Sequence, residues 1–343
     1  MRRHGIWPRL AALAIGITLC EILLRLAGVA YPAWDRPTPG FREWGIPRAE
    51  GWAVGETRQY VRLNTIGTHD VDHDLQKPED AFRVVVVGDS FTAAFEVERE
   101  QAFWAVMEDE LSGCPALEKR RVEAINISKR GFGTAEELLA LRRFGFAYDP
   151  DWVVLAFFTG NDVRNNARAL QGSKRPYFVR DEGGELKLDE SYADELDYQL
   201  WSGWLGDLWY GIVGHSRLVQ LVRHVHRRVE ALAETVALRS APGDASRGES
   251  PPQESTRDAP PAEEGGPKAD PGRRDALPEV ELGLDDGVYL EAPDPVWQSA
   301  WEITEDIVRL MRDEVRAEGA EMMWMTLSNP IQVDPDPLRR QAH

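Results

Sequence analysis

The sequence predicts an α/β fold in which a parallel β-sheet is covered by helices on both faces. Short runs rich in β-branched residues are typical of buried strands, and segments with helical periodicity separate them. Strands that alternate with helices of this length form right-handed crossovers and hence a parallel sheet. The four strands are expected at residues 82–88, 121–128, 151–158 and 322–328.

Three helices are expected between these strands. Residues 101–113 and 134–145 carry apolar side chains at helical spacing, and each segment ends at a glycine, as helices commonly do. The third helix begins at Asp294, a good N-cap that is followed by proline in the first helical position, and it ends near Gly319. The alternation of strand and helix is broken only between about residues 166 and 293.

The composition indicates a folded protein and narrows its partners. With 343 residues, 43% hydrophobic residues and 12 Trp, the chain can form a sizeable core. A formal net charge of −18 argues against nucleic acid as a partner, because nucleic-acid binders concentrate Lys and Arg. The two cysteines, Cys20 and Cys114, have no metal-ligand spacing, and we expect no disulfide between them.

Residues 1–30 are expected to be a membrane anchor. The apolar stretch from Leu10 to Ala30 has about the length of a bilayer span, although Glu21 and Arg25 interrupt it. The basic residues before it predict a cytoplasmic N-terminus, with the rest of the chain on the periplasmic or extracellular side. A cleaved signal peptide with Leu10 to Cys20 as its apolar region is the main alternative, but no good small-x-small cleavage site comes directly after Cys20. A bulky Leu also precedes Cys20 where a lipidation site needs a small residue.

The remaining chain divides into five segments by composition. We expect an irregular approach segment, a first core part, a helical insertion, a disordered linker rich in Pro, Glu, Ser and Gly, and a second core part. Their boundaries are residues 31–80, 81–170, 171–240, 241–275 and 276–343.

The insertion contains two amphipathic segments, from Trp201 to Ile212 and from Leu218 to Leu232. The second has a basic face, which fits either a solvated side of a packed helix or an arm on an anionic membrane surface. His224 and His226 are two residues apart and so do not share a helix face, which argues against a metal site.

Candidate catalytic residues follow the first three strands. The carboxyl ends of parallel strands meet at one edge of a sheet, so the loops with GDS (88–90), NISKRGFG (126–133) and TGND (159–162) should converge. Ser90 could simply cap the next helix, but in such a convergence it could also be a nucleophile. Gly131 could then offer a backbone N–H and Asn161 a side-chain amide to an oxyanion.

Two other motifs fail on detail. The α/β-hydrolase elbow requires a glycine two residues after the serine, and GDSFT has none. GFGTAE resembles the start of a dinucleotide-binding fingerprint, but Glu136 occupies the place of the third glycine.

In order and spacing, VVVVGDSFT, NISKRGFG and TGND resemble blocks I, II and III of the SGNH/GDSL hydrolases, over roughly residues 60–166 and more loosely 276–330. LNTIGTHD (63–70) is also similar to the approach segment of membrane-tethered bacterial members. The resemblance implies a flavodoxin-like three-layer α/β/α fold and hydrolysis of an ester (O-acyl) bond through an acyl-serine, without a metal or organic cofactor. It also implies Ser90 as nucleophile, with Gly131 and Asn161 as oxyanion-hole donors.

The family's last block, Asp-x-x-His, does not follow the fourth strand. We therefore expect a C-terminally truncated form that lacks its general base, because a serine hydroxyl without a base is a weak nucleophile. His343, or His69 or His73 from the approach segment, would be the substitutes.

Three functions remain open. The first is a hydrolase acting on an acyl ester of a surface carbohydrate or lipid. The second is an O-acyltransferase acting on a cell-surface glycan through the same acyl-serine. The third is a non-catalytic binding domain that keeps the pocket.

Overall fold

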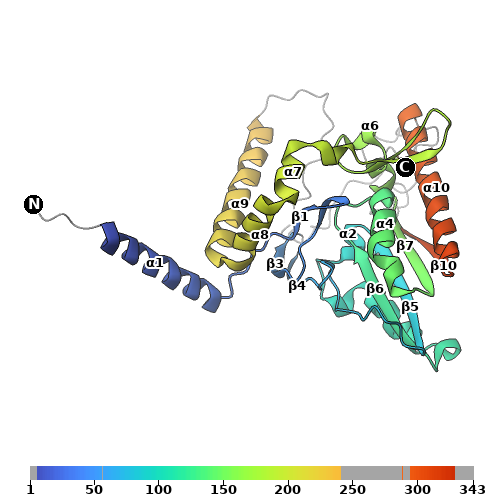
Figure 1. The fold of residues 1–343 in the computed structure, drawn as a ribbon, viewed down its shortest axis with the longest axis horizontal. Helices are drawn as coiled ribbons and strands as arrows, with labels where there is room; N and C mark the ends of the chain where they lie inside the picture. Colours follow the sequence, from blue (N-terminus) through green and yellow to red (C-terminus); the bar gives the residue numbers. More distant parts are fainter. Residues whose placement is uncertain (1–5, 56, 241–287, 289–293, 329–343) are drawn as a thin grey trace, which may run out of the picture.

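A four-stranded parallel sheet with strand order β10-β7-β5-β6 organises the fold (Figure 1). The computed structural model describes residues 6–55, 57–240, 288 and 294–328. All four predicted strands are confirmed, as β5 (Ala81–Gly88), β6 (Arg121–Ser128), β7 (Trp152–Phe158) and β10 (Glu321–Leu327). Every residue of β5 is buried, which explains why its sequence is an uninterrupted apolar run rather than an alternating one.

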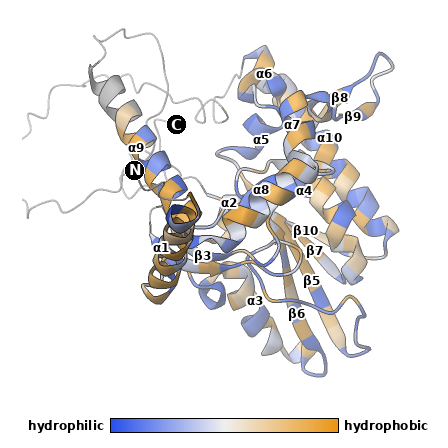
Figure 2. Ribbon diagram, turned by 60° about the vertical axis from the view of Figure 1, so that its left-hand side comes forward, coloured by the Kyte–Doolittle hydropathy of each residue, from blue (hydrophilic) through white to orange (hydrophobic). Residues whose placement is uncertain are grey.

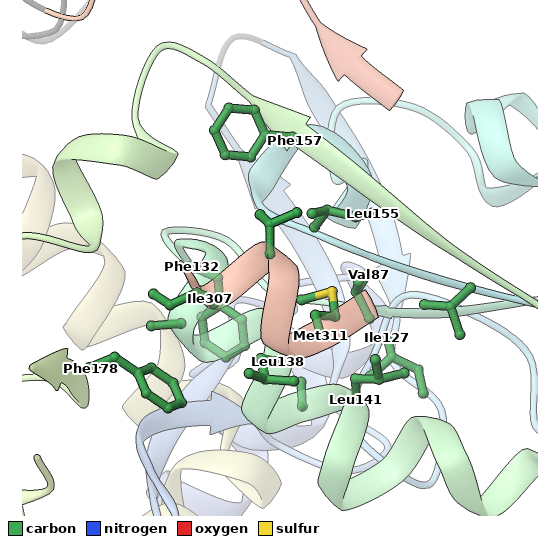
Figure 3. Close-up of a cluster of buried hydrophobic side chains, with 14 of the residues drawn as sticks. Val87, Ile127, Phe132, Leu138, Leu141, Leu155, Phe157, Phe178, Ile307 and Met311 are labelled. Carbon is green, nitrogen blue, oxygen red and sulfur yellow. The ribbon is translucent and has the colours of Figure 1, made fainter. Parts of the chain in front are cut away.

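Helices pack on both faces of the sheet. On one face, α4 (Thr134–Ala140) and α10 (Pro295–Ala317) cover alternate residues of the strands, among them Val85 and Val87. Figure 3 shows this cluster, in which Ile307 and Met311 of α10 lie against side chains from the sheet and from α4. On the other face, α3 (Phe103–Ser112) packs against the intervening valines of β5 through buried Trp104. The protein is thus a mixed α/β structure.

Helix α10 is joined to the core by polar contacts as well as by its apolar stripe. Its expected N-cap is confirmed, because the Asp294 side chain accepts hydrogen bonds from the N–H groups of Val296 and Trp297 at 2.9 and 3.0 Å. Farther along, the Thr304 hydroxyl accepts a hydrogen bond from Asn166 Nδ2 at 2.9 Å. A segment near the end of the sequence thereby contacts the loop that follows β7.

The composition predicts an irregular approach segment. The structure shows instead that this segment forms two β-hairpins. They consist of β1 (Asp35–Thr38) with β2 (Phe41–Gly45), and β3 (Glu50–Val54) with β4 (Arg58–Arg62). Strands of four or five residues that contain Pro, Gly and Trp show too little alternation to be read from the sequence. Phe41 and Trp44 of β2 are buried against the ring of Phe132 and join the core.

The insertion is helical, as expected, and also contains a hairpin that the sequence did not reveal. Its helices are α7 (Leu196–Ser202), α8 (Trp204–His215) and α9 (Arg217–Ser240), and its hairpin pairs β8 (Tyr177–Arg180) with β9 (Leu186–Asp189). The expected linker, residues 241–275, lies outside the described residues. Shorter elements are α2 (Ser90–Ala93), α5 (Asp162–Asn165), α6 (Arg168–Gln171), and the turns η1 (Arg99–Gln101), η2 (Pro115–Leu117), η3 (Leu141–Gly145), η4 (Phe146–Tyr148) and η5 (Ser191–Asp194).

The N-terminal segment is a helix, α1 (Ile6–Leu26), that projects away from the sheet (Figure 1). It is hydrophobic over most of its length (Figure 2). No helix within the described residues combines the length and the apolar composition needed to cross a bilayer, so the expected transmembrane helix is not supported. The apolar run is cut by Glu21 and Arg25, which form an ion pair at 2.9 Å.

Glu21 has a structural partner far along the chain. Its carboxylate accepts hydrogen bonds from the backbone N–H groups of Arg217 at 2.8 Å and Leu218 at 3.1 Å, in the first turn of α9. These N–H groups have no partner within the helix, so Glu21 caps α9 from another element. The Arg25 guanidinium donates to the carbonyl of His215 at the end of α8. Glu21 and Arg25 therefore join α1 to the helical insertion.

Candidate functional site

The loops that follow β5, β6 and β7 meet at one edge of the sheet. In the strand register Gly88 lies beside Ser128 on one side and beside Ala156 on the other, so β5 and β6 end at the same level and β7 continues to Phe158. The Lys129 N–H donates to the Gly88 carbonyl at 3.3 Å. Asn161 Nδ2 donates to Asp89 Oδ2 at 3.1 Å. The convergence inferred from the sequence is therefore present.

Asp89, not Ser90, caps the helix that follows β5. Asp89 is the N-cap of α2, and its Oδ1 accepts a hydrogen bond from the Phe91 N–H at 2.9 Å. Ser90 is the first helical residue, and its hydroxyl makes only a long contact of 3.5 Å to Asp89 Oδ2 within the described part of the chain. The interpretation of Ser90 as a capping residue is therefore wrong, and its hydroxyl is available for chemistry.

The turn before Ser90 depends on glycine. A Cβ at Gly88 would lie 2.2 Å from Thr92 Oγ1, so only glycine allows α2 to pack this closely on the end of β5. Thr92 is itself buried, and its carbonyl accepts from Trp104 Nε1 at 3.0 Å. The position of Ser90 is thus fixed by contacts on both sides of it.

Ser90 lines a mostly apolar cavity of about 320 Å³. The cavity extends from Phe91 and Ala94 to Ala102 and Phe103, with Glu96 and Gln101 as its polar members besides Ser90. The Phe91 ring packs on Phe158 at the end of β7, with 4.3 Å between the ring centroids. The serine hydroxyl therefore borders a space that can take an apolar group next to it.

Gly131 and Asn161 lie in the two neighbouring loops. Gly131 has a φ of +80°, which favours glycine, and its carbonyl accepts from Arg175 Nη2 at 2.9 Å. Its N–H has no hydrogen-bond acceptor among the residues that the structure describes. Asn161 is linked to Ser90 through Asp89, whose Oδ2 contacts both side chains. Ser90 and Asn161 are therefore brought together, and Gly131 lies on the adjacent loop without a hydrogen bond to either.

None of the five described histidines makes a hydrogen bond to Ser90. His69 is buried, and its Nδ1 lies 3.0 Å from the carbonyl of Ala93; burial lowers the pKa of its imidazole. His73 Nε2 lies 3.1 Å from Asp70 Oδ2. The approach segment thus uses both histidines for other contacts, and His343 lies outside the described residues.

Four carboxyl groups are buried around this edge of the sheet, and none of them has a role in the motifs read from the sequence. They belong to Asp89, Glu136, Glu137 and Asp162. Asp162 Oδ2 accepts from the Phe158 N–H at 2.7 Å. Its Oδ1 and both carboxyl oxygens of Glu137 have no hydrogen-bond partner within the described residues. Burial raises the pKa of each of the four, and the neighbouring charge of Asp162 raises that of Glu137 further.

One of these residues had a signal in the sequence. Glu136 stands three residues after Gly133, in the position of a capping box, and its Oε2 accepts from the Gly133 N–H at 3.3 Å. Within the described residues no group of three His, Cys, Asp or Glu side chains is placed to hold a metal ion, so these carboxyl groups do not form a metal site there.

Comparison with protein-family profiles gives no match, and comparison with curated proteins gives none. Among solved structures, the crystal structure of TesA matches with 28% sequence identity over 24% of this chain and 42% of TesA, at a TM-score of 0.21. The chain thus spans less than half the length of TesA. An overlap of this quality carries no argument about fold or activity.

The buried carboxyl of Glu137 predicts an unusual dependence of stability on pH. A carboxyl whose pKa is raised on folding favours the protonated form in the folded state, so stability falls as pH rises above the ordinary value of 4.5. Glu137→Gln removes this charge. We expect the free energy of unfolding of this variant to exceed that of wild type at about pH 8 and to equal it at about pH 4.

Urea unfolding at several pH values measures this difference. Glu118→Gln, at an exposed position on the same chain, is the control and should change neither the stability nor its pH dependence. A wild type whose stability rises steadily between these pH values relative to Glu137→Gln contradicts the expectation.

Proposed function

We propose that this protein is a serine hydrolase of the SGNH/GDSL type, which cleaves an ester bond through an acyl-serine intermediate. The observation that supports it best is the placement of Ser90. It follows a buried strand, borders an apolar cavity, and is joined by Asp89 to the amide of Asn161. A flavodoxin-like arrangement, with helices on both faces of a parallel sheet, is consistent with this assignment.

In the proposed mechanism the Ser90 hydroxyl oxygen attacks the ester carbonyl, and the alcohol leaves to give an acyl-serine. The negative charge that develops on the carbonyl oxygen is stabilised by N–H donors from Asn161, Gly131 and Ser90 itself. Water then attacks the acyl-serine and releases the acid. The reaction needs a base for the Ser90 proton, and none of the described histidines occupies that position.

The absence of an imidazole beside Ser90 in the described part of the chain supports a second candidate, a non-catalytic binding domain with the same pocket. Transfer of the acyl group to a glycan hydroxyl would use the same acyl-serine and differs only in the acceptor. Turnover of an acyl donor with and without a glycan acceptor distinguishes hydrolysis from transfer.

Ser90→Ala should abolish both ester hydrolysis and labelling by a fluorophosphonate probe, because the probe reacts with an activated serine hydroxyl. The hydroxyl makes a single long contact, so the variant should unfold at nearly the same urea concentration as wild type. Ser112→Ala, on an exposed part of α3, is the matched control and should still be labelled. No labelling of wild type would favour the binding domain, and labelling of the Ser90→Ala variant would reject Ser90 as the nucleophile.

Asn161→Ala should lower kcat for ester hydrolysis by about 10²-fold, as expected for loss of one oxyanion donor. The Michaelis constant should change much less, because the charge on the oxygen develops only in the transition state. Steady-state kinetics with a chromogenic acetyl ester measure both. A change confined to the Michaelis constant would make Asn161 a binding residue instead.

We also propose that the protein works at a lipid surface, which would make a lipid or surface-carbohydrate ester its substrate. Helix α9 supports this, because Val222, Val225 and Val229 form an exposed apolar stripe with Arg227 and Arg228 beside it. Helix α8 exposes Trp204 and Leu208, and α1 leaves the body beside this pair of helices (Figures 1 and 2).

The protein should therefore sediment together with vesicles that contain anionic lipid. Replacing Val225 and Val229 by Asp should weaken this binding by about tenfold, because two carboxylates would then interrupt the apolar stripe that faces the lipid. Val106→Asp, at an exposed position of α3, is the control and should bind like wild type. Wild-type protein that stays in the supernatant at every lipid concentration would exclude the lipid surface.

A further inference from the structure

A second cavity, of about 390 Å³, lies against the loop that carries Gly131. Five of its ten lining residues are basic, namely Arg42, Lys129, Arg130, Lys174 and Arg175. The chain as a whole carries 58 acidic and 40 basic residues, so this local concentration of positive charge is opposite to the overall charge. We propose that this cavity binds an anionic group of the substrate, such as a carboxylate or a phosphate; the proposal rests on the proposed ester hydrolysis.

The burial and the few hydrogen bonds of Lys129 are the strongest observation in favour of such a site. The residue is only 9% exposed, yet its ammonium has one hydrogen bond, to the carbonyl of Arg130 at 3.1 Å, although it has three hydrogens to donate. The nearest carboxylates, Asp35 and Glu43, are 3.7 and 3.9 Å away, beyond hydrogen-bond distance. The ring of Phe132 lies at 5.5 Å and compensates the charge only in part. A buried ammonium with unused donors is costly unless a ligand completes its shell.

Two arginines of the same cavity also have unused donors. Arg42 Nη1 and Arg175 Nη1 are buried and have no hydrogen-bond partner among the described residues. The other ends of these guanidinium groups are held, by Asp197 at 2.7 Å and by the Gly131 carbonyl at 2.9 Å. Both side chains are thus fixed in place. Arg42 Nη1 stays available, whereas Arg175 Nη1 lies 3.0 Å from Glu136 Oε2. Fixed guanidinium donors suit carboxylate and phosphate oxygens.

Carboxylates offset part of this charge, because Asp35 forms ion pairs with both Lys129 and Arg130 at 3.7 Å. Glu136 Oε2 lies 3.0 Å from Arg175 Nη1, an ion pair without hydrogen-bond geometry, and it also accepts from the Gly133 N–H in the capping box. Burial raises the pKa of Glu136, whereas the neighbouring charge of Arg175 lowers it. Glu43 is farther from the ammonium of Lys129 than a hydrogen bond allows. Lys129 therefore keeps donors that neither carboxylate uses for a hydrogen bond, and an anion in the cavity would accept them.

The position of the cavity relates it to catalysis. Arg175 contacts Gly131 directly, so an anion bound here lies beside the loop proposed to stabilise the oxyanion. The separate apolar cavity at Ser90 would receive the acyl group. The two cavities together fit an ester whose alcohol part carries an acid group, such as an acylated sugar acid or a phosphorylated sugar.

Binding of small anions tests the site without any turnover. We expect isothermal titration at constant ionic strength to detect glucuronate or inorganic phosphate, but not glucose, with the wild type and equally with Ser90→Ala. Lys129→Met should weaken anion binding by about tenfold, the effect of losing one hydrogen bond to a charged group. Lys174→Met, at a largely exposed position, gives a second variant with little risk to folding and should weaken binding less.

Lys187→Met is the matched control, because Lys187 is exposed and pairs with Asp181 away from the cavity, at 2.6 Å. It should bind anions like wild type. Binding of glucuronate alone indicates a sugar acid, and binding of phosphate alone indicates a phosphorylated substrate. The site is overturned if neither anion binds, if glucose binds equally well, or if a folded Lys129→Met variant binds as tightly as wild type.

Kinetics separate failure of this site from failure of the proposed function. Lys129→Met should raise KM for an acetylated uronate about tenfold more than KM for a neutral acetyl ester, because only the uronate carries the anionic group. Anion binding without any ester turnover would retain the site and reject the hydrolase. Ester turnover without anion binding would do the reverse.

Discussion

The arrangement of the candidate site depends on the buried carboxyl group of Asp89. It receives hydrogen bonds from the Phe91 N–H and from Asn161 Nδ2, and it contacts the Ser90 hydroxyl. None of the ion pairs found among the described residues includes Asp89, so these neutral donors must compensate its burial. Because the donors come from the loops after β5 and β7, satisfying one carboxyl group also fixes the relative position of both loops.

Much of the core could be predicted because its local and tertiary signals agree. A few residues are enough to predict a strand from the valine run of β5 and a helix start from Asp294-Pro295 of α10. Both elements appear as expected. The hairpins β1–β2 and β8–β9 could not be predicted, since strands of four or five residues are defined by their partners. The expected transmembrane helix is not supported among the described residues. Glu21 and Arg25 of α1 have partners 196 and 190 residues away in the chain, which a local apolar pattern cannot show.

The positions of Ser90, Gly131 and Asn161 followed from one rule, that parallel strands end at the same edge of a sheet. Their surroundings did not follow. The sequence of GDS suggested that Ser90 could cap the helix, whereas Asp89 does so, and only the backbone geometry distinguishes the two. Likewise, Lys129 and Arg175 become neighbours of one cavity because separate loops converge, which no spacing in the sequence records.

The contact between Glu21 and the start of α9 couples the position of α1 to that of the helical insertion through polar groups. The Glu21 carboxylate accepts hydrogen bonds from two backbone N–H groups of α9, and Arg25 donates one to the last residue of α8. One turn of α1 therefore contacts both helices where α8 ends and α9 begins. A displacement of α1 would therefore be transmitted to both helices as a unit.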